Sequence, residues 1–124
     1  MRVYLPATAA DLSAPQIGPR TAYAVTPALA RALPDEDEEA LEASAGLCAA
    51  DASLTLLAAP GAEALADRRI VIAADVGTAQ VTEPEASGDA LPGTVRVKAP
   101  VAWEAVAALL VDERAAEADV RAAR

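Results

Sequence analysis

Residues 69–76, which read RIVIAADV, constrain the fold of this chain more than any other segment. Apolar and β-branched side chains follow one another here without the alternation that marks a strand with one wet face. A strand of this composition is buried on both sides, because neither set of its side chains is suited to water. We therefore predict a central strand at 69–76 that is covered on both faces.

The other strand signals are weaker and are spread along the chain. Alternation of apolar and polar residues is typical of half-exposed strands, and we expect 94–98 to lie nearer a sheet edge. The segment 106–112 is ambiguous between strand and helix, and we favour a strand because it is short and rich in Val and Leu. The predicted strands are 2–5, 21–25, 94–98 and 106–112, with a short edge strand also considered at 79–82 within the loop 77–93.

The longest helix is predicted at 35–59. Asp35 is a suitable N-cap, and Glu38 occupies the third helical position of a capping box. One face of this helix is apolar at spacings of three and four, so we expect it to pack on the core. That face consists of Leu41, Ala45, Cys48, Ala52 and Leu56, and Leu47, Leu54 and Leu57 widen it.

These elements indicate a single small α+β (mixed α/β) domain over residues 1–113. We expect a four- to five-stranded sheet with the long helix packed across one face. Short helices at 9–13 and 28–33 complete the domain. The Ala- and charge-rich tail, 114–124, is expected to be helical or disordered and to lie outside the core.

The chain contains no His, Asn or Phe, and Cys48 and Lys98 are its only cysteine and lysine. Without His, one chain cannot build a Ser-His-Asp or Cys-His relay, and a single Cys cannot complete a zinc site or an internal disulfide. No glycine-rich phosphate loop is present. The remaining chemistry is that of carboxylates, arginines, hydroxyls and tyrosines, so we predict no cofactor and no metal centre.

The net charge of −9 disfavours binding to nucleic acid, because phosphates repel an acidic surface. The first residues lack the apolar segment of a signal peptide, and no apolar run reaches the length of a membrane span. We therefore expect a cytoplasmic protein that binds neither nucleic acid nor membranes.

An acidic run opens the long helix and is one candidate contact for a basic protein partner. The ordinary alternative is that negative charge stabilises the positive end of the helix dipole. The run consists of Asp35, Glu36, Asp37, Glu38 and Glu39. Trp103 is the second contact candidate if it is exposed, because Trp is enriched at interface hot spots; otherwise it fills the core.

Carboxylates stand at the ends of the two most apolar strands: Asp75 after one, and Asp112 and Glu113 after the other. If these strands are neighbours and parallel, the carboxylates meet at one rim and could bind Mg²⁺ or a sugar hydroxyl. Otherwise they are polar residues that end strands as the chain leaves the core.

A second candidate binding patch lies beside the first two strands. Arginine forks match carboxylates and phosphates, and tyrosine hydroxyls can assist them, so these side chains could bind an anion. Exposed Arg and Tyr are also common on ordinary strands. The patch consists of Arg2, Tyr4, Arg20 and Tyr23.

The chain resembles a family of short, acidic, Ala-rich actinobacterial proteins of unknown function. The likeness rests on MRVYLPAT at 1–8, AVTPAL at 24–29, DEDEEALE at 35–42, RRIVIAADV at 68–76 and the closing residues 111–113. The resemblance implies an actinobacterial host and supplies no activity, cofactor or catalytic residue.

We therefore expect a cytosolic, non-enzymatic interaction or regulatory module. The alternative is a small-molecule or divalent-cation binder, including a carboxylate-dependent enzyme that uses Asp75, Asp112 and Glu113. A third hypothesis is a homodimer in which an edge strand pairs with its twin.

Overall fold

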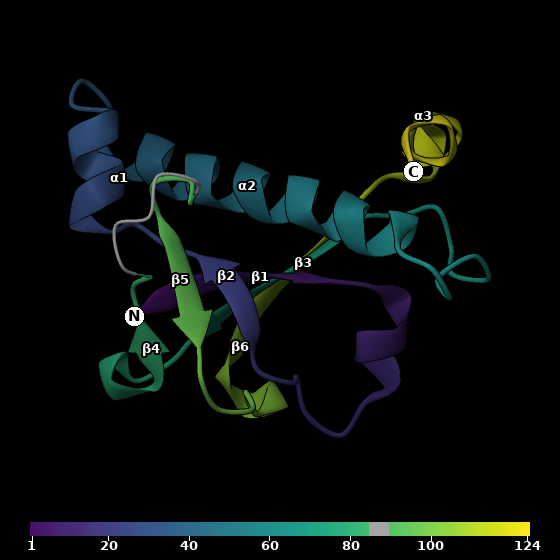
Figure 1. Cartoon of the computed structure of the whole chain (residues 1–124), viewed down its shortest axis with the longest axis horizontal. Helices are drawn as coiled ribbons and strands as arrows, with labels where there is room; N and C mark the ends of the chain where they lie inside the picture. The colour runs from purple at the N-terminus through teal and green to yellow at the C-terminus, as the bar shows by residue number, and fades with distance from the viewer. Residues whose placement is uncertain (85–89) are drawn as a thin grey trace.

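The computed structural model describes residues 1–84 and 90–124, and the predicted loop 77–93 lies partly outside the described residues. All described strands belong to one antiparallel sheet in the order β4-β5-β2-β1-β3-β6, with one long helix across a face (Figure 1). The strands are β1 (Arg2–Ala7), β2 (Arg20–Tyr23), β3 (Ile70–Asp75), β4 (Val81–Thr82), β5 (Thr94–Val97) and β6 (Val106–Val111).

The mixed α/β architecture is confirmed, but the sheet has six strands and not the four or five expected. The sixth strand is β4, which lies within the segment 79–82 that was considered as a short edge strand; it stands at the end of the sheet and pairs only with β5. Two residues are too few to show a period in the sequence, so such a strand depends on a neighbour that is already in place.

The helices are α1 (Pro27–Ala32), α2 (Glu38–Ala58) and α3 (Glu117–Ala123), with 3₁₀ turns η1 (Ala9–Ser13), η2 (Thr78–Gln80), η3 (Trp103–Ala105) and η4 (Arg114–Ala116). The Thr26 side chain caps α1 by accepting a hydrogen bond from the Leu29 N–H, as its sequence position predicted. At η1 the Thr8 N–H donates to the Asp11 carboxylate. Local capping chemistry thus fixes where both short helices begin.

The long helix begins later than predicted. Its N-cap is Asp37, whose carboxylate accepts from the Ala40 N–H, so Asp35 precedes the helix. Its buried face also differs from the predicted one: Cys48, Ala52 and Leu56 are not on it, and Ser53 is. Of the residues predicted to widen that face, Leu57 is buried but Leu47 is 67% exposed. The buried residues are Leu41, Ala45, Ala49, Ser53 and Leu57, which follow a spacing of four throughout. A serine within this face interrupts its apolar periodicity, which is why the sequence pattern favoured a neighbouring face.

Strand β3 is buried from Ile70 to Ala74, as its composition predicted. It lies between β1 and β6, one place from the end of the sheet. β5 lies one place from the other end, so the two strands are equally near an edge, and the expectation that β3 is central and β5 nearer an edge is wrong. The middle positions belong to β2 and β1.

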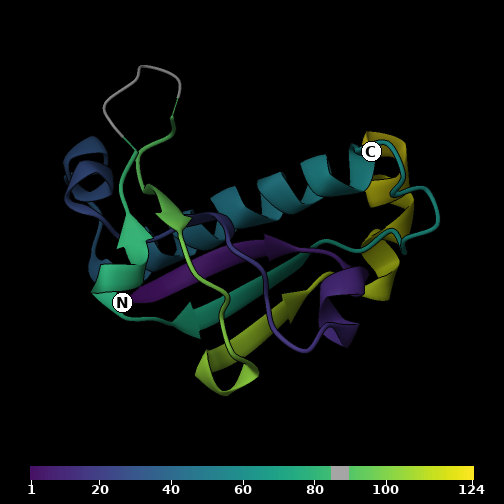
Figure 2. The ribbon, with the colours of Figure 1, turned by 60° about the horizontal axis from the view of Figure 1, so that its bottom comes forward.

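The core has two parts, one on each face of the sheet. The larger cluster includes Val3, Leu5 and Ile72 and lies on the face opposite α2, where Ile17, Val101 and the half-buried Trp103 close it. Figure 2 shows α2 on one side of the sheet, with η1 and η3 on the other. The smaller cluster lies beneath α1 and α2 and contains Leu29, Leu41 and Ala45, with Tyr4 and Tyr23 packed against it.

The segment after residue 113 is helical and packs on the domain. Val120 of α3 is buried, which corrects the expectation that the tail lies outside the core. The Arg124 guanidinium donates to the carbonyl of Leu57, in the last turn of α2, to that of Ala62 in the loop after it, and to the Asp67 carboxylate. These contacts join α3 to the C-terminal end of α2.

Candidate functional site

The outer edge of β6 is the most distinctive surface of the described molecule. This strand has the sequence VAALLV and has β3 as its only neighbour, which confirms the preference for a strand in 106–112. Leu109, Leu110 and Val111 are 45%, 49% and 44% exposed. Proteins normally protect an edge strand with charges, proline or a very short length. β6 spans six residues and carries neither a charge nor a proline. A β-bulge interrupts its pairing with β3 near the start, while residues 108–111 form a regular ladder.

The outer face of α2 continues this apolar surface. Leu47 is 67% exposed, and Ala43, Gly46 and Ala50 lie near it. By length and composition α2 is apolar enough to cross a membrane, a property that the core helix of a soluble protein can share. A helix that packs on a sheet normally presents polar residues on the face that meets water. In this chain the sheet covers one face of α2 and leaves another open.

A groove of about 470 Å³ joins the two apolar surfaces, with Leu47 on the α2 side and Leu110 on the β6 side. At its base the Tyr4 hydroxyl donates to the Glu42 carboxylate at 2.5 Å. Burial and the neighbouring Glu42 raise the pKa of Tyr4 to about 12, so the hydroxyl remains a donor at neutral pH. The tyrosine ring lies beneath Gly46, where an added Cβ would be 3.8 Å from the ring, an ordinary contact distance.

Asp112 and Arg69 close one end of the groove. The Asp112 carboxylate accepts from Nε, from a terminal nitrogen of Arg69 and from the Arg69 backbone N–H, at 2.9, 3.0 and 2.8 Å. Hydrogen bonds from Arg69 hold the pKa of Asp112 below its ordinary value, against the opposing effect of burial. This carboxylate therefore fastens the end of β6 to the start of β3, while Glu113 beside it is exposed.

The structure does not bring Asp75 and Asp112 together. β3 and β6 are neighbours but run antiparallel, so Asp75 at the end of β3 and Asp112 after β6 lie at opposite ends of the strand pair. Asp75 is instead paired with Arg2 at 2.7 Å. Within residues 1–84 and 90–124 no group of three or more acidic or cysteine side chains could hold a metal ion.

The predicted anion patch is also divided. Tyr4 and Tyr23 are cross-strand partners beneath the helices, but Arg2 and Arg20 lie at opposite ends of the β1–β2 pair. Arg20 donates to Asp11 and to two backbone carbonyls. Both guanidinium groups are thus engaged by acceptors of the chain itself.

Of the two predicted partner contacts, Trp103 and one residue of the acidic run 35–39 have structural roles. Asp37 caps α2, while the other acids of the run are exposed at its start. Trp103 is half-buried against the larger core cluster, and its indole N–H donates to the Ala14 carbonyl at 2.9 Å. The position of Trp103 therefore agrees with the alternative that it fills the core.

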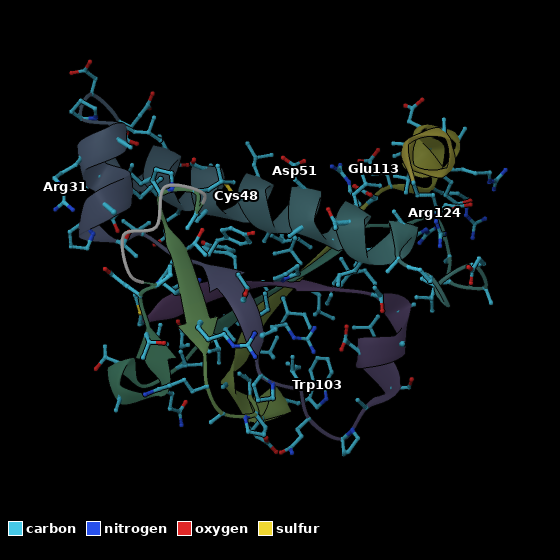
Figure 3. The ribbon with its side chains drawn as sticks, viewed as in Figure 1. Arg31, Cys48, Asp51, Trp103, Glu113 and Arg124 are labelled. Carbon is cyan, nitrogen blue, oxygen red and sulfur yellow. The ribbon has the colours of Figure 1, made fainter. Side chains whose placement is uncertain are left out.

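A second hollow, of about 930 Å³, lies on the opposite flank of α2 beside β2. Its charged residues are Asp11, Arg20 and Asp51, and the first two form an ion pair. Cys48 and Asp51 line it from α2 and are labelled in Figure 3, and the Tyr23 ring contributes from the sheet. Burial, and then Asp51, raise the pKa of the Cys48 thiol, which disfavours the reactive thiolate.

Sequence reasoning identified Tyr4, Asp112 and Tyr23 but missed the surfaces on which they lie. The available signal was a strand, VAALLV, that lies between Glu104 and Asp112 and has no charge of its own. The same signal describes a fully buried strand, and only its position in the sheet distinguishes the two.

Comparison with curated proteins and with solved structures finds no significant match. The sequence profile of one family matches the chain over residues 1–124. The chain therefore belongs to the family of unknown function DUF6912.

Proposed function

We propose that this protein is a non-enzymatic, cytosolic interaction module that binds a strand of another polypeptide along the free edge of β6. The observation that carries the proposal is an edge strand with three large apolar side chains 44% to 49% exposed and no protecting charge. A strand added at such an edge gains main-chain hydrogen bonds, and its side chains are covered on alternate faces.

The adjoining groove supports this proposal. Leu110 faces the α2 side of the sheet, since it is the register partner of Val71, which lines the same groove. Leu109 is the register partner of Ile72 and therefore faces the other side of the sheet. An added strand would therefore contact apolar surface on both sides of the sheet. The outer face of α2, through Leu47, would cover it on one of them.

The test is a pull-down at low salt, which compares the polypeptides retained by the wild-type protein with those retained by Leu110→Lys. Leu12→Lys is the matched control, because Leu12 is a similarly exposed leucine in η1. We expect Leu110→Lys alone to lose a bound polypeptide, and bound wild-type protein to show slowed hydrogen exchange at the β6 amides. Equal recovery by both variants, or unchanged β6 exchange in the complex, would refute the proposal.

The resemblance noted in the sequence supports an actinobacterial host, and the cytosol is the compartment in which we expect the module to act. Fractionation of host cells, followed by detection of the protein, tests this location. Recovery from the membrane or the culture medium would contradict it.

A second candidate function is the binding of a small organic cation in the hollow beside β2. The Asp51 carboxylate and the Tyr23 hydroxyl both line it, and among the described residues neither makes a hydrogen bond. Because Asp11 and Arg20 neutralise each other, Asp51 supplies the net charge of the hollow. An amine with an apolar body would match this charge and the mainly apolar walls.

Measurement of the melting temperature with added ligands tests whether the hollow beside β2 binds amines. Amines should raise the melting temperature, carboxylic acids of the same skeleton should not, and Asp51→Asn should abolish the effect while Asp35→Asn retains it. Mg²⁺, Mn²⁺, nucleotides and sugars belong in the same panel, because they test the divalent-cation and carboxylate-enzyme alternatives. Absence of any shift would remove all of these functions.

A further inference from the structure

We infer that the strand that pairs with β6 is β6 of a second copy of this chain, in an antiparallel dimer centred on Leu109. This inference rests on the proposed interaction edge and names its occupant. Two copies would then share one continuous sheet across a two-fold axis, with the α2 helices on the same side.

The symmetry limits the permitted registers. Two antiparallel edge strands that continue a sheet are related by a two-fold axis perpendicular to that sheet, so directly opposed residues must lie on the same face. Successive residues point to opposite faces. The two-fold axis must therefore pass between one residue and the same residue of the other copy. Within β6 this central residue can be Ala108, Leu109 or Leu110.

The β-bulge selects among these choices. Ala74 is the partner of Val106 and Ala73 is the partner of Ala108, so Ala107 is the extra residue. The remaining ladder positions of β6 are 106, 108, 109, 110 and 111, and their midpoint is Leu109. A dimer centred on Leu109 places every ladder position opposite another ladder position of the same apolar strand.

The other two registers bring acids into the ladder. Centring on Leu110 moves Asp112, which is held by Arg69, opposite Ala108 of the other copy. Centring on Ala108 shifts the register in the opposite direction. With the extra residue Ala107 left out of the ladder, Glu104 then lies opposite Val111 of the other copy. An acid opposite an apolar residue gains nothing from the pairing and loses hydration. Only the register centred on Leu109 avoids both.

Charge distinguishes a second copy from a basic partner. Each chain carries −9, so two copies repel one another at long range and must be held together by apolar contact and main-chain hydrogen bonds. Salt screens this repulsion, with a Debye length that falls from about 10 Å at 0.1 M to about 3 Å at 1 M. The dimer should thus tighten as salt is added, whereas a complex with a basic protein should weaken.

Sedimentation velocity over a concentration series tests the association at low and at high salt. We expect a dimer whose dissociation constant falls with added salt, and we expect Leu109→Lys to raise that constant by about tenfold or more. Circular dichroism of Leu109→Lys checks that the variant is folded. A wild-type protein that remains a monomer at every concentration would overturn the inference.

Disulfide trapping tests the register. In a Cys48→Ala background, Leu109→Cys brings two thiols together across the axis, whereas Leu110→Cys places them on diagonal positions further apart. Leu12→Cys reports random collision. We expect covalent dimer to form fastest with Leu109→Cys. Faster trapping by Leu110→Cys, or equal rates for all three, would overturn the register.

Failure of this inference can be separated from failure of the proposed function. If the chain is a monomer but a different polypeptide protects the β6 amides and is lost with Leu110→Lys, self-pairing is wrong and the interaction edge stands. If neither a dimer nor such a complex forms, both are wrong.

Discussion

At the scale of single residues, Ser53 shows how one polar atom organises apolar layers. It is fully buried, and its hydroxyl donates to the Ala7 carbonyl at 2.7 Å and accepts from the Ile70 N–H at 3.0 Å. These groups lie at the end of β1 and the start of β3, so one side chain of α2 joins two strands. A buried backbone group that loses its partner costs free energy, because water cannot replace the bond.

Substitution Ser53→Ala should lower the free energy of unfolding by about 1–3 kcal/mol, because it leaves the Ile70 N–H and the Ala7 carbonyl without this partner. Ser44→Ala is the control, since Ser44 is only half-buried on the same helix. We expect the control to change stability by less than about 0.5 kcal/mol. Urea unfolding curves measure both, and equal losses would contradict this role for Ser53.

At the scale of elements, ion pairs and capping contacts fasten strand and helix ends. Asp112 joins β6 to β3, and Arg124 joins α3 to α2. Neither contact could be predicted from the local sequence, because the partners are 43 and 67 positions apart. Their effect is to hold in place the two elements that complete the C-terminal part of the domain.

The Asp112 contact should make stability depend on pH in the acid range. Its folded-state pKa is lowered from 3.8, so the stabilisation is present above that value and is lost as the pH falls through the lower folded-state pKa. The wild-type protein should therefore lose stability in this window more steeply than Asp112→Asn. Urea unfolding at a series of pH values measures the difference, and parallel curves for the two proteins would contradict it.

Substitution Arg124→Ala should loosen α3 and lower the free energy of unfolding by about 1–3 kcal/mol. The Arg124 side chain is 11% exposed, and it donates to carbonyls at the C-terminal end of α2, where a cation is favoured. Arg114→Ala is the control, because Arg114 is exposed. Hydrogen exchange of α3 and thermal unfolding provide the readouts, and similar behaviour of the two variants would refute the assigned contact.

At the scale of the whole molecule, an acidic domain of net charge −9 presents one apolar edge. The charge repels copies of the chain from one another, and the inferred dimer has them meet at the edge of β6. A complex that forms only from folded chains stabilises them by mass action. The melting temperature should therefore show whether the β6 edge is paired.

We expect the melting temperature of the wild-type protein to rise with protein concentration, because the dimer is favoured at higher concentration. Leu109→Lys should melt at a temperature that does not depend on concentration, since its edge no longer pairs. Calorimetry over a wide concentration range measures both. A concentration-independent wild-type melting temperature would argue against a folded dimer.

Local physics determined much of this protein from the sequence alone. The buried strand Ile70–Asp75 follows from an unbroken β-branched run, the start of α1 follows from Thr26 and Pro27, and the helical nature of α2 follows from its length and composition. Each of these depends on residues that are near one another in the chain. The absence of histidine likewise limits the available chemistry whatever fold the chain adopts.

The tertiary structure alone decided how these elements meet. It placed β6 at the edge and antiparallel to β3, which separated Asp75 from Asp112, and it selected the face of α2 that carries Ser53. The physical reason is that strand order, strand direction and helix rotation depend on contacts between distant residues. The sequence VAALLV is typical of a buried strand and is half-exposed here only because no seventh strand follows it within the described sheet.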